Sequence, residues 1–145
     1  MKPKLVEHQG EDCEKLDSFL SERIYEFNSL AIACFDGKLF GYAMHDERGQ
    51  VIAGASGHTW AGCCQLTHLW VLESLRGEGL GQELLRAVET EATRRGCSVV
   101  LLATHSFQAP VFYEQLGYER QAVVQDHPIG HSNFVYSKRL PQNDA

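Results

Sequence analysis

The segment Arg76-Gly77-Glu78-Gly79-Leu80-Gly81 carries the clearest chemical signal in this sequence. It follows an apolar run from Leu66 to Leu72 that is typical of a strand, and it precedes residues with helical periodicity. A glycine-rich turn at a helix start leaves backbone N–H groups without acceptors, and the helix dipole adds positive charge there. Glycine also lets a ligand approach the backbone closely. The segment therefore predicts an anion site suited to phosphate groups.

The spacing of the glycines excludes two familiar nucleotide-binding motifs. No Gly-Lys-Ser or Gly-Lys-Thr sequence ends the segment, so it is not a P-loop. Gly77, Gly79 and Gly81 alternate, whereas a dinucleotide-binding turn places its third glycine three residues after the second. Taken alone, the segment is compatible with a phosphate ligand and with a plain helix start.

A second segment, from Ala109 to Tyr118, predicts a short helix that stops at a glycine. Its apolar positions share one helix face, at i, i+3, i+4 and i+7 spacing: Ala109, Phe112, Tyr113 and Leu116. Pro110 is tolerated in a first helical turn, and Gly117 suits a left-handed C-terminal cap. Another helix and an apolar strand, Ser98 to Ala103, separate this segment from the glycine-rich loop.

This order of elements resembles the GNAT acyl-CoA N-acetyltransferase superfamily, whose two best-known signatures match here residue by residue. The pyrophosphate loop of the superfamily falls on Arg76, Gly79 and Gly81. The later signature falls on Ala109, Tyr113, Gly117 and Tyr118. Its first position, usually Asn, is Ser106 in this sequence. The resemblance is strong from Leu66 to Val123 and weak before that.

The resemblance implies an α+β fold, with a mixed, mostly antiparallel central sheet, a splayed parallel strand pair and about four flanking helices. We expect one N-acetyltransferase domain over 1–145. Periodicity predicts strands at 4–8, 38–46, 50–59, 64–72, 99–103, 118–124 and 132–140. It predicts helices at 12–28, with a kink or split near Ser21, at 79–95 and at 109–116. The run 30–35 is a short strand or a buried loop, and 99–103 is expected to be buried on both faces.

Composition bounds the class of protein. The chain has 145 residues with 43% apolar content, which suits one globular core. It has no run of about 18 apolar residues and no apolar signal-peptide core, so we expect a cytoplasmic protein without membrane contact. An odd number of cysteines, 5, fits reduced thiols in that compartment. The net charge of −6 argues against nucleic-acid binding and mildly favours cationic substrates.

The resemblance implies acetyl-CoA as cosubstrate, bound between the strands that end near Val71 and Ala103. The pantetheine arm would pair with main-chain atoms of Leu69 and Val71, as an added strand does, and the pyrophosphate would sit on the loop amides. The expected contact residues are Leu69, Val71, Arg76, Gly77, Glu78, Gly79, Leu80, Gly81, Ser106, Ala109, Phe112 and Tyr113. An aromatic set is expected to line a pocket: Trp60, Trp70, Phe107, Phe112 and Tyr113.

Acetyl transfer to an amine needs a neutral amine, donors for the thioester oxygen and a proton for the leaving thiolate. The resemblance implies that Tyr113 supplies that proton. As general base we name His68, which precedes the loop on the same strand and alternates in phase with Leu66 and Trp70. Gln65 stands where some family members carry a glutamate base. The other options are a water relay and His58, His105, Asp46 and Glu73.

The expected reaction is direct attack, in a ternary complex, by the amine of a small molecule: a polyamine, an amino-sugar or peptide-like antibiotic, or an amino-acid derivative. A protein lysine or N-terminus is the enzymatic alternative, and a non-catalytic acyl-CoA-binding module is the alternative from another class. We expect no metal site, because Cys63, Cys64 and His68 lack a fourth ligand and because His127 and His131 lie in a predicted loop. A homodimer is an expectation by family analogy.

Overall fold

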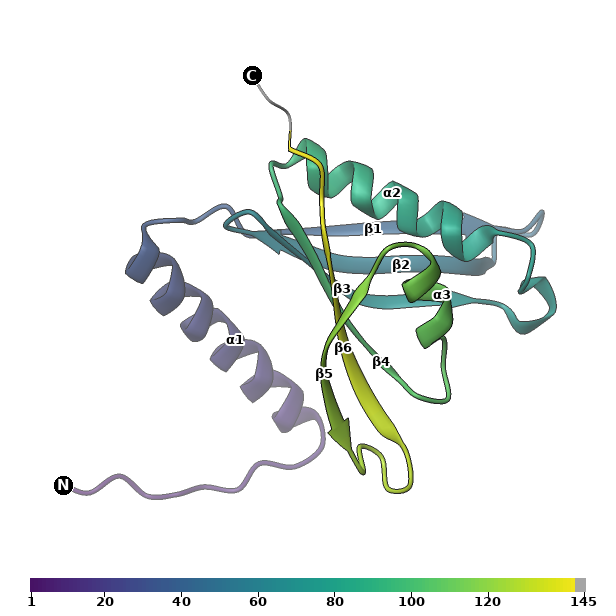
Figure 1. Ribbon diagram of the computed structural model, residues 1–145. Helices are drawn as coiled ribbons and strands as arrows, with labels where there is room; N and C mark the ends of the chain where they lie inside the picture. Colours follow the sequence, from purple (N-terminus) through teal and green to yellow (C-terminus); the bar gives the residue numbers. More distant parts are fainter. Residues whose placement is uncertain (143–145) are drawn as a thin grey trace. The chain divides into compact units, whose positions relative to one another are not determined.

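The computed structural model describes residues 1–142, and Figure 1 shows its elements along the chain. The chain divides into two compact units, Met1–Phe35 and the residues from Asp36 onward. The elements in chain order are α1 (Glu11–Ile32), β1 (Lys38–His45), β2 (Val51–Trp60), β3 (Cys63–Val71), the 3-10 helix η1 (Glu73–Leu75), α2 (Leu80–Arg94), β4 (Val99–His105), α3 (Pro110–Gln115), β5 (Glu119–Gln125) and β6 (Ser132–Arg139).

The first unit is one unbroken helix, α1, preceded by a segment without regular structure (Figure 1). Acidic side chains gather in its first turn, near the positive end of the helix dipole: Glu11, Asp12 and Glu14. The helix ends before Ala33, which adopts a left-handed conformation and donates its N–H to the Ser29 carbonyl. Three expectations are wrong here. Residues 4–8 form no strand, α1 does not split near Ser21, and 30–35 is the helix end and the residues after it.

The second unit contains a six-stranded sheet in the order β1-β2-β3-β4-β6-β5. The first three strands form an antiparallel meander, β3 and β4 are parallel, and β6 pairs antiparallel with both β4 and β5. Helix α2 lies along one face of the meander (Figure 1). The mixed α+β fold is confirmed, with three α-helices and one 3-10 helix in residues 1–142 where about four helices were expected.

A β-bulge interrupts the pairing of β2 with β3. Ser56 pairs with His68 whereas the next residue, Gly57, pairs with Leu66, so Thr67 is the extra residue on β3. Because neighbouring residues on β2 point to opposite faces, their partners Leu66 and His68 do so too. Leu66 is buried in the core that α2 covers, and His68 is exposed on the other face. The expected alternation of His68 in phase with Leu66 is therefore wrong.

Helix α2 forms because its apolar residues recur at helical spacing and face the meander. Its buried side chains are Leu84, Leu85, Val88 and Ala92. Each is at most 3% exposed, and burial of one Leu or Val side chain contributes about 1.5–3 kcal/mol to folding. This packing fixes the helix on the sheet and thereby fixes the position of its first turn.

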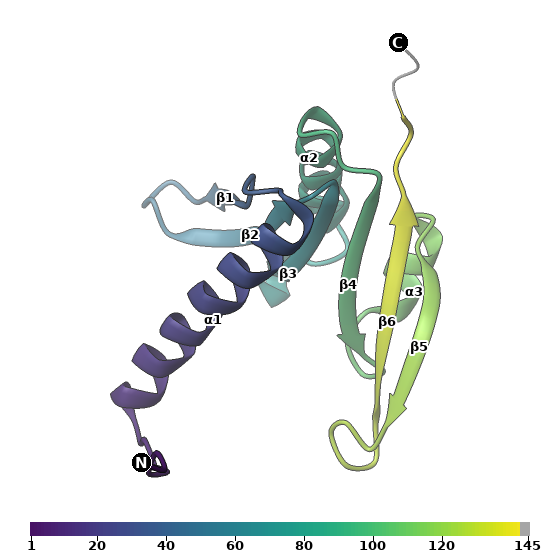
Figure 2. The same cartoon turned by 90° about the vertical axis from the view of Figure 1, so that its left-hand side faces the viewer.

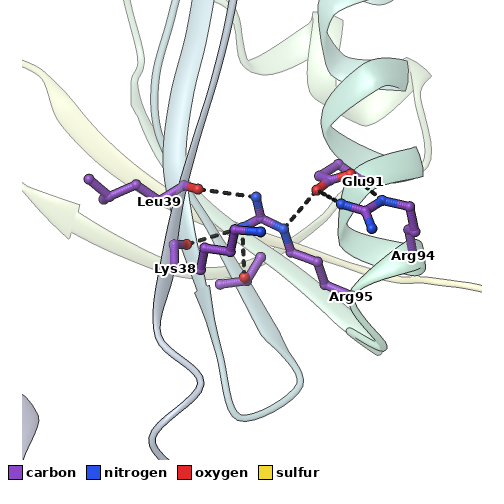
Figure 3. A network of polar contacts seen from close by, with 6 residues as sticks. Lys38, Leu39, Glu91, Arg94 and Arg95 are labelled. Atoms are coloured by element: carbon purple, nitrogen blue, oxygen red, sulfur yellow. Dashed lines mark hydrogen bonds and ion pairs between the residues drawn. The ribbon is translucent and has the colours of Figure 1, made fainter.

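Arg95, which follows α2, fastens the end of the helix to β1 and β2 (Figure 3). Its guanidinium donates to the Lys38 carbonyl (3.1 Å), the Leu39 carbonyl (3.1 Å), the Thr59 hydroxyl (2.9 Å) and the Glu91 carboxylate (2.8 Å). Hydrogen bonds from Arg94 and Arg95 lower the pKa of Glu91 to about 2. The carboxylate therefore stays charged at neutral pH, and the helix is held at both its apolar face and its C-terminal end.

The parallel strands β3 and β4 separate after a short stretch of pairing. Their register runs from Cys63 opposite Val99 to Gln65 opposite Leu101 and then stops. Beyond this point β4 continues along β6, and the two strands diverge (Figures 1 and 2). Within residues 1–142, the rest of β3, as far as Val71, therefore has no strand partner on the β4 side.

Burial alternates along β4 within the second unit. Val100, Leu102 and Thr104 are buried, whereas Leu101 and Ala103 are exposed. The expectation that 99–103 is buried on both faces is therefore wrong. An uninterrupted apolar run shows only that both faces of the strand tolerate burial, and it does not show that both are covered.

Candidate active site

The glycine-rich loop joins η1 to α2 and presents a row of backbone donors. Gly77 and Gly79 have φ values of 83° and 86°, which glycine adopts without strain. Gly79 is the N-cap of α2, and no side chain caps the helix. Within residues 1–142, the N–H groups from Gly77 to Gln82 have no hydrogen-bond acceptor. The positive end of a helix of 15 residues thus carries free amides, which is the arrangement that binds phosphate.

Arg76 stands at the start of this row, and its side chain has a fixed place. Its Nε donates to the Val71 carbonyl at the end of β3, over 3.0 Å. The bond ties the loop to the strand and leaves the two terminal nitrogens of the guanidinium for an anion. The side chain of Arg76 therefore lies at the loop end of the cleft, while its backbone N–H donates to the Glu73 carbonyl over 3.2 Å.

A cleft of about 620 Å³ opens beside the loop. The predicted contact residues that line it are Leu69, Val71, Arg76, Gly77, Gly79, Leu80, Gly81, Ala109, Phe112 and Tyr113. From the predicted aromatic set, Trp70 and Phe107 line it as well, and Trp60 does not. A Cβ on Gly81 would lie 3.3 Å from the Phe112 ring, so the first turn of α2 and the helix α3 approach closely.

Three lining residues were not anticipated from the sequence: Leu75, Gln82 and Gln108. Gln82 lies in the first turn of α2, so helix geometry applied to the loop motif would have found it. Gln108 is held by its side-chain oxygen, which accepts the His105 N–H over 2.7 Å. That bond turns the chain back after β4. The residue types in this segment do not predict the bond.

Glu78, Ser106 and His68 are predicted site residues that do not line the cleft. Ser106 joins the end of β4 to the start of β6, because it donates its N–H to the Ser132 carbonyl (2.8 Å) and accepts the Ser132 N–H at its hydroxyl (3.0 Å). Its contact with a cosubstrate, like that of Glu78, stays a prediction.

Tyr113, the predicted acid, lies on α3 and is only 7% exposed. Its ring packs edge-on against Phe112 (5.1 Å between centroids) and Tyr118 (5.8 Å). Burial raises the pKa of Tyr113 to about 12. The hydroxyl therefore keeps its proton throughout the neutral range, and Tyr113 is one of the residues that line the cleft.

A polar network holds α3 against β5 and β6. Glu114, the residue after Tyr113, accepts hydrogen bonds from the Tyr136 hydroxyl (2.7 Å) and from Arg120 (3.1 Å). The Arg120 guanidinium also lies 3.8 Å from the centroid of the Phe134 ring. Since Tyr136 is fully buried, this network fixes the orientation of α3 and of the tyrosine it carries.

The cleft itself offers no side-chain base: among residues 1–142, those that line it include no carboxylate and no imidazole. His68 lies on the other face of the sheet, with its Nδ1 3.4 Å from the Ser56 hydroxyl. A base at His68 would therefore take a proton from an acceptor that approaches from that face. Asp46 is engaged in a turn, where its Oδ1 accepts the N–H groups of Arg48 (2.8 Å) and Gln50 (3.0 Å).

The buried cysteines are not activated nucleophiles. All five cysteines are free thiols, and Cys64 and Cys97 lie in the core. Burial raises the pKa of Cys64 to about 12 and also raises the pKa of Cys97. Both thiols therefore stay protonated at neutral pH, when only a thiolate would accept an acyl group readily.

The described residues, 1–142, lack two features. They contain no cluster of three or more His, Cys, Asp or Glu side chains that could hold a metal ion. None of the helices in the same residues has the length and apolar character needed to cross a membrane.

Free amides at a helix start, an unpaired strand edge and a buried, protonated tyrosine line one cleft, and this combination suits an extended ligand that carries phosphate groups. Residues 3–118 match the Acetyltransferase (GNAT) family. The chain belongs to this family, whose members use acetyl-CoA, and it is an acyltransferase.

Individual proteins similar to this chain are also named as acetyltransferases. The chain is 36% identical over 95 residues to blasticidin-S acetyltransferase of Streptomyces morookaense, an alignment that covers 65% of this chain and 70% of the relative. It is 31% identical over 105 residues to an acetyltransferase of Agrobacterium fabrum, with 72% and 77% covered. An acetyltransferase structure from Bacillus cereus superimposes with a TM-score of 0.78 at 31% identity, covering 94% of this chain and 98% of that one.

Proposed function

We propose that this protein transfers the acetyl group of acetyl-CoA to a primary amine of a small molecule, by direct attack in a ternary complex. The observation that carries the proposal is the row of free amides from Gly77 to Gln82 at one end of the cleft. A diphosphate bound there would place the rest of the cosubstrate along the unpaired edge of β3, toward Tyr113.

The donor side of the site follows from backbone chemistry. The amides of the loop and the guanidinium of Arg76 would hold the diphosphate, because oriented N–H groups and a planar cation both suit its oxygens. The free edge of β3 at Leu69 and Val71 offers main-chain groups to the amides of the pantetheine arm. A backbone N–H at this edge would polarise the thioester carbonyl as it gains negative charge.

The transfer step moves one proton at each end. The neutral amine nitrogen forms a bond to the acetyl carbon, the carbon–sulfur bond breaks, and the sulfur takes the proton of the Tyr113 hydroxyl. The new amide loses its extra proton on the acceptor side, to His68 or to water, and Tyr113 regains a proton from solvent. No acyl-enzyme is needed, because the cleft contains no side chain that is a ready acyl acceptor.

A small-molecule acceptor is supported by two observations. The relative at 36% identity is named for blasticidin S, a small molecule. The net charge of −6 attracts cationic amines over a long range.

The test is release of coenzyme A thiol from acetyl-CoA in the presence of a panel of amines: polyamines, aminoglycosides, streptothricin-like antibiotics, blasticidin S and lysine peptides. We expect release with at least one small amine, together with mass-spectrometric evidence of one added acetyl group. Tight binding of acetyl-CoA without turnover on any member of the panel would favour a binding module. Turnover confined to the peptides would favour a protein acetyltransferase.

A further inference from the structure

A second hollow, of about 630 Å³, lies at the end of β4 beside the loop that joins β5 to β6. Its lining residues are His105, Asp126, His127, Pro128 and Ile129. It shares no lining residue with the cleft. Aromatic side chains beside the hollow connect its lining to that of the cleft.

Four rings form what we call the ring cluster: His105, Phe107, His127 and His131. The His105 ring is stacked on Phe107 (5.3 Å between centroids, 14° between planes) and on His127 (5.8 Å, 25°). The His131 ring meets Phe107 edge-on at 4.9 Å. Phe107 also lines the cleft and His105 lines the second hollow, so this stacked pair of rings joins the linings of the two spaces.

The loop behind the ring cluster is locked by its own hydrogen bonds. The His105 Nδ1 lies 2.9 Å from the His127 carbonyl, and the His131 N–H donates to the Pro128 carbonyl over 2.9 Å. The Asp126 carboxylate accepts the Gly130 N–H over 3.2 Å. These bonds hold the loop backbone and the His105 ring in place before any ligand arrives, which lowers the entropic cost of binding.

The ring cluster contributes little to the core of the protein. Phe107 is 56% exposed, and Ile129, which lines the hollow, is 89% exposed. Exposed apolar groups gathered beside a hollow are typical of a binding surface. Nearly parallel ring faces favour one class of ligand group, a further planar ring, because offset stacking gives energy beyond that of buried area.

We propose that the hollow beside the ring cluster binds the non-reacting part of the acceptor, and that this part is a planar unsaturated ring. The amine, carried on a short arm, reaches past Phe107 into the cleft. The proposal rests on the proposed function and narrows it: amines with an aromatic or heteroaromatic ring are preferred over saturated amines such as polyamines and amino-sugars.

The test is a matched pair of amines, 2-phenylethylamine and 2-cyclohexylethylamine, which differ in the planarity of one ring. With acetyl-CoA saturating, we expect kcat/KM to be about three- to tenfold higher for the phenyl compound, the range given by aromatic pair energies. His127→Leu should bring this ratio close to one, and His127→Phe, which keeps a ring in the stack, should preserve it. His45→Leu, at the far end of β1, is the control.

Binding is measured alongside turnover, so that the two proposals fail separately. In NMR spectra of the protein with coenzyme A, the phenyl compound should shift the imidazole signals of His105 and His127 more than the cyclohexyl compound does. Equal rates and equal shifts for the two amines would overturn the ring proposal and leave the acetyltransferase proposal standing. Selective shifts without any turnover would support the ring site and contradict the proposed reaction.

Discussion

At Gly79, aspartate compared with alanine should change stability and ligand binding in opposite directions. It is the N-cap of α2, has φ 86°, and a Cβ added there meets no atom within 4 Å. Alanine at this backbone conformation costs about 1–2 kcal/mol of stability. Gly79→Asp shares that strain, but its carboxylate can accept the first free amides of the helix, which returns about 0.5–2 kcal/mol. The aspartate variant should therefore be more stable than the alanine variant by about 1 kcal/mol.

Coenzyme A affinity should move the other way. The aspartate occupies donors that the diphosphate needs and adds a like charge beside it. At about 5 Å and an effective dielectric constant of about 20, each pair of unit charges costs about 3 kcal/mol. We therefore expect the Kd of Gly79→Asp to be about a hundredfold higher than that of Gly79→Ala. The gap should narrow with added salt, because screening weakens the repulsion.

The assay is calorimetric titration with coenzyme A at two salt concentrations, paired with urea unfolding of both variants. The alanine variant is the matched control, because it carries the same backbone strain without the charge. If the two folded variants bind coenzyme A equally well, the loop amides do not hold the diphosphate and the reasoning is refuted.

Four further predictions concern the acid, the helix anchor and one core thiol. Tyr113→Phe should lower kcat by about 10²-fold with little change in the Kd for acetyl-CoA. The loss in kcat should be the same at pH 7 and pH 9, because the pKa of Tyr113 is raised to about 12. If the variant and the native protein have the same kcat, Tyr113 is a packing residue. The pKa of Tyr113 in the folded protein lies above its value in the unfolded chain. The free energy of unfolding should therefore stay constant below pH 10 and decrease between about pH 10 and 12. Urea unfolding at alkaline pH should show a smaller decrease in Tyr113→Phe than in the native protein. Arg95→Met should lower the free energy of unfolding, measured with urea, by about 2–3 kcal/mol, because it removes four hydrogen bonds. The control Arg94→Met, at an exposed side chain, should lower it by at most about 0.5 kcal/mol. Equal losses in the two variants would contradict the anchoring role of Arg95. Cys64, whose thiol pKa is raised to about 12, should react with a disulfide reagent only after unfolding, and fast labelling in the native protein, followed by mass spectrometry, would contradict its burial.

Much of the second unit could be predicted from sequence because its signals are local. Each signal acts over a few residues: the glycine spacing from Gly77 to Gly81, the apolar period of α2, and the helix stop at Gly117. Strands β1 to β6 are likewise predicted from local patterns of apolar residues. The secondary structure of the N-terminal region cannot be predicted as well from local patterns. A six-residue apolar run such as 30–35 cannot be assigned to helix or strand by periodicity alone, and 4–8 has no strand partner in the part of the chain that is described, 1–142.

The parts of the site that sequence reasoning missed depend on residues far apart in the chain. The bulge at Thr67 follows from the pairing of β2 with β3, and it moves His68 to the face opposite Leu66. Arg95 reaches backbone carbonyls more than fifty residues earlier in the chain. Such contacts are set by the tertiary fold and leave no pattern in the neighbouring residues.

The most direct test of the central claim is a crystal structure of the protein with coenzyme A. The account predicts the diphosphate on the backbone N–H groups from Gly77 to Gln82, the pantetheine arm along β3 at Leu69 and Val71, and the sulfur beside the Tyr113 hydroxyl. A diphosphate held elsewhere, with those amides still unoccupied, would contradict it.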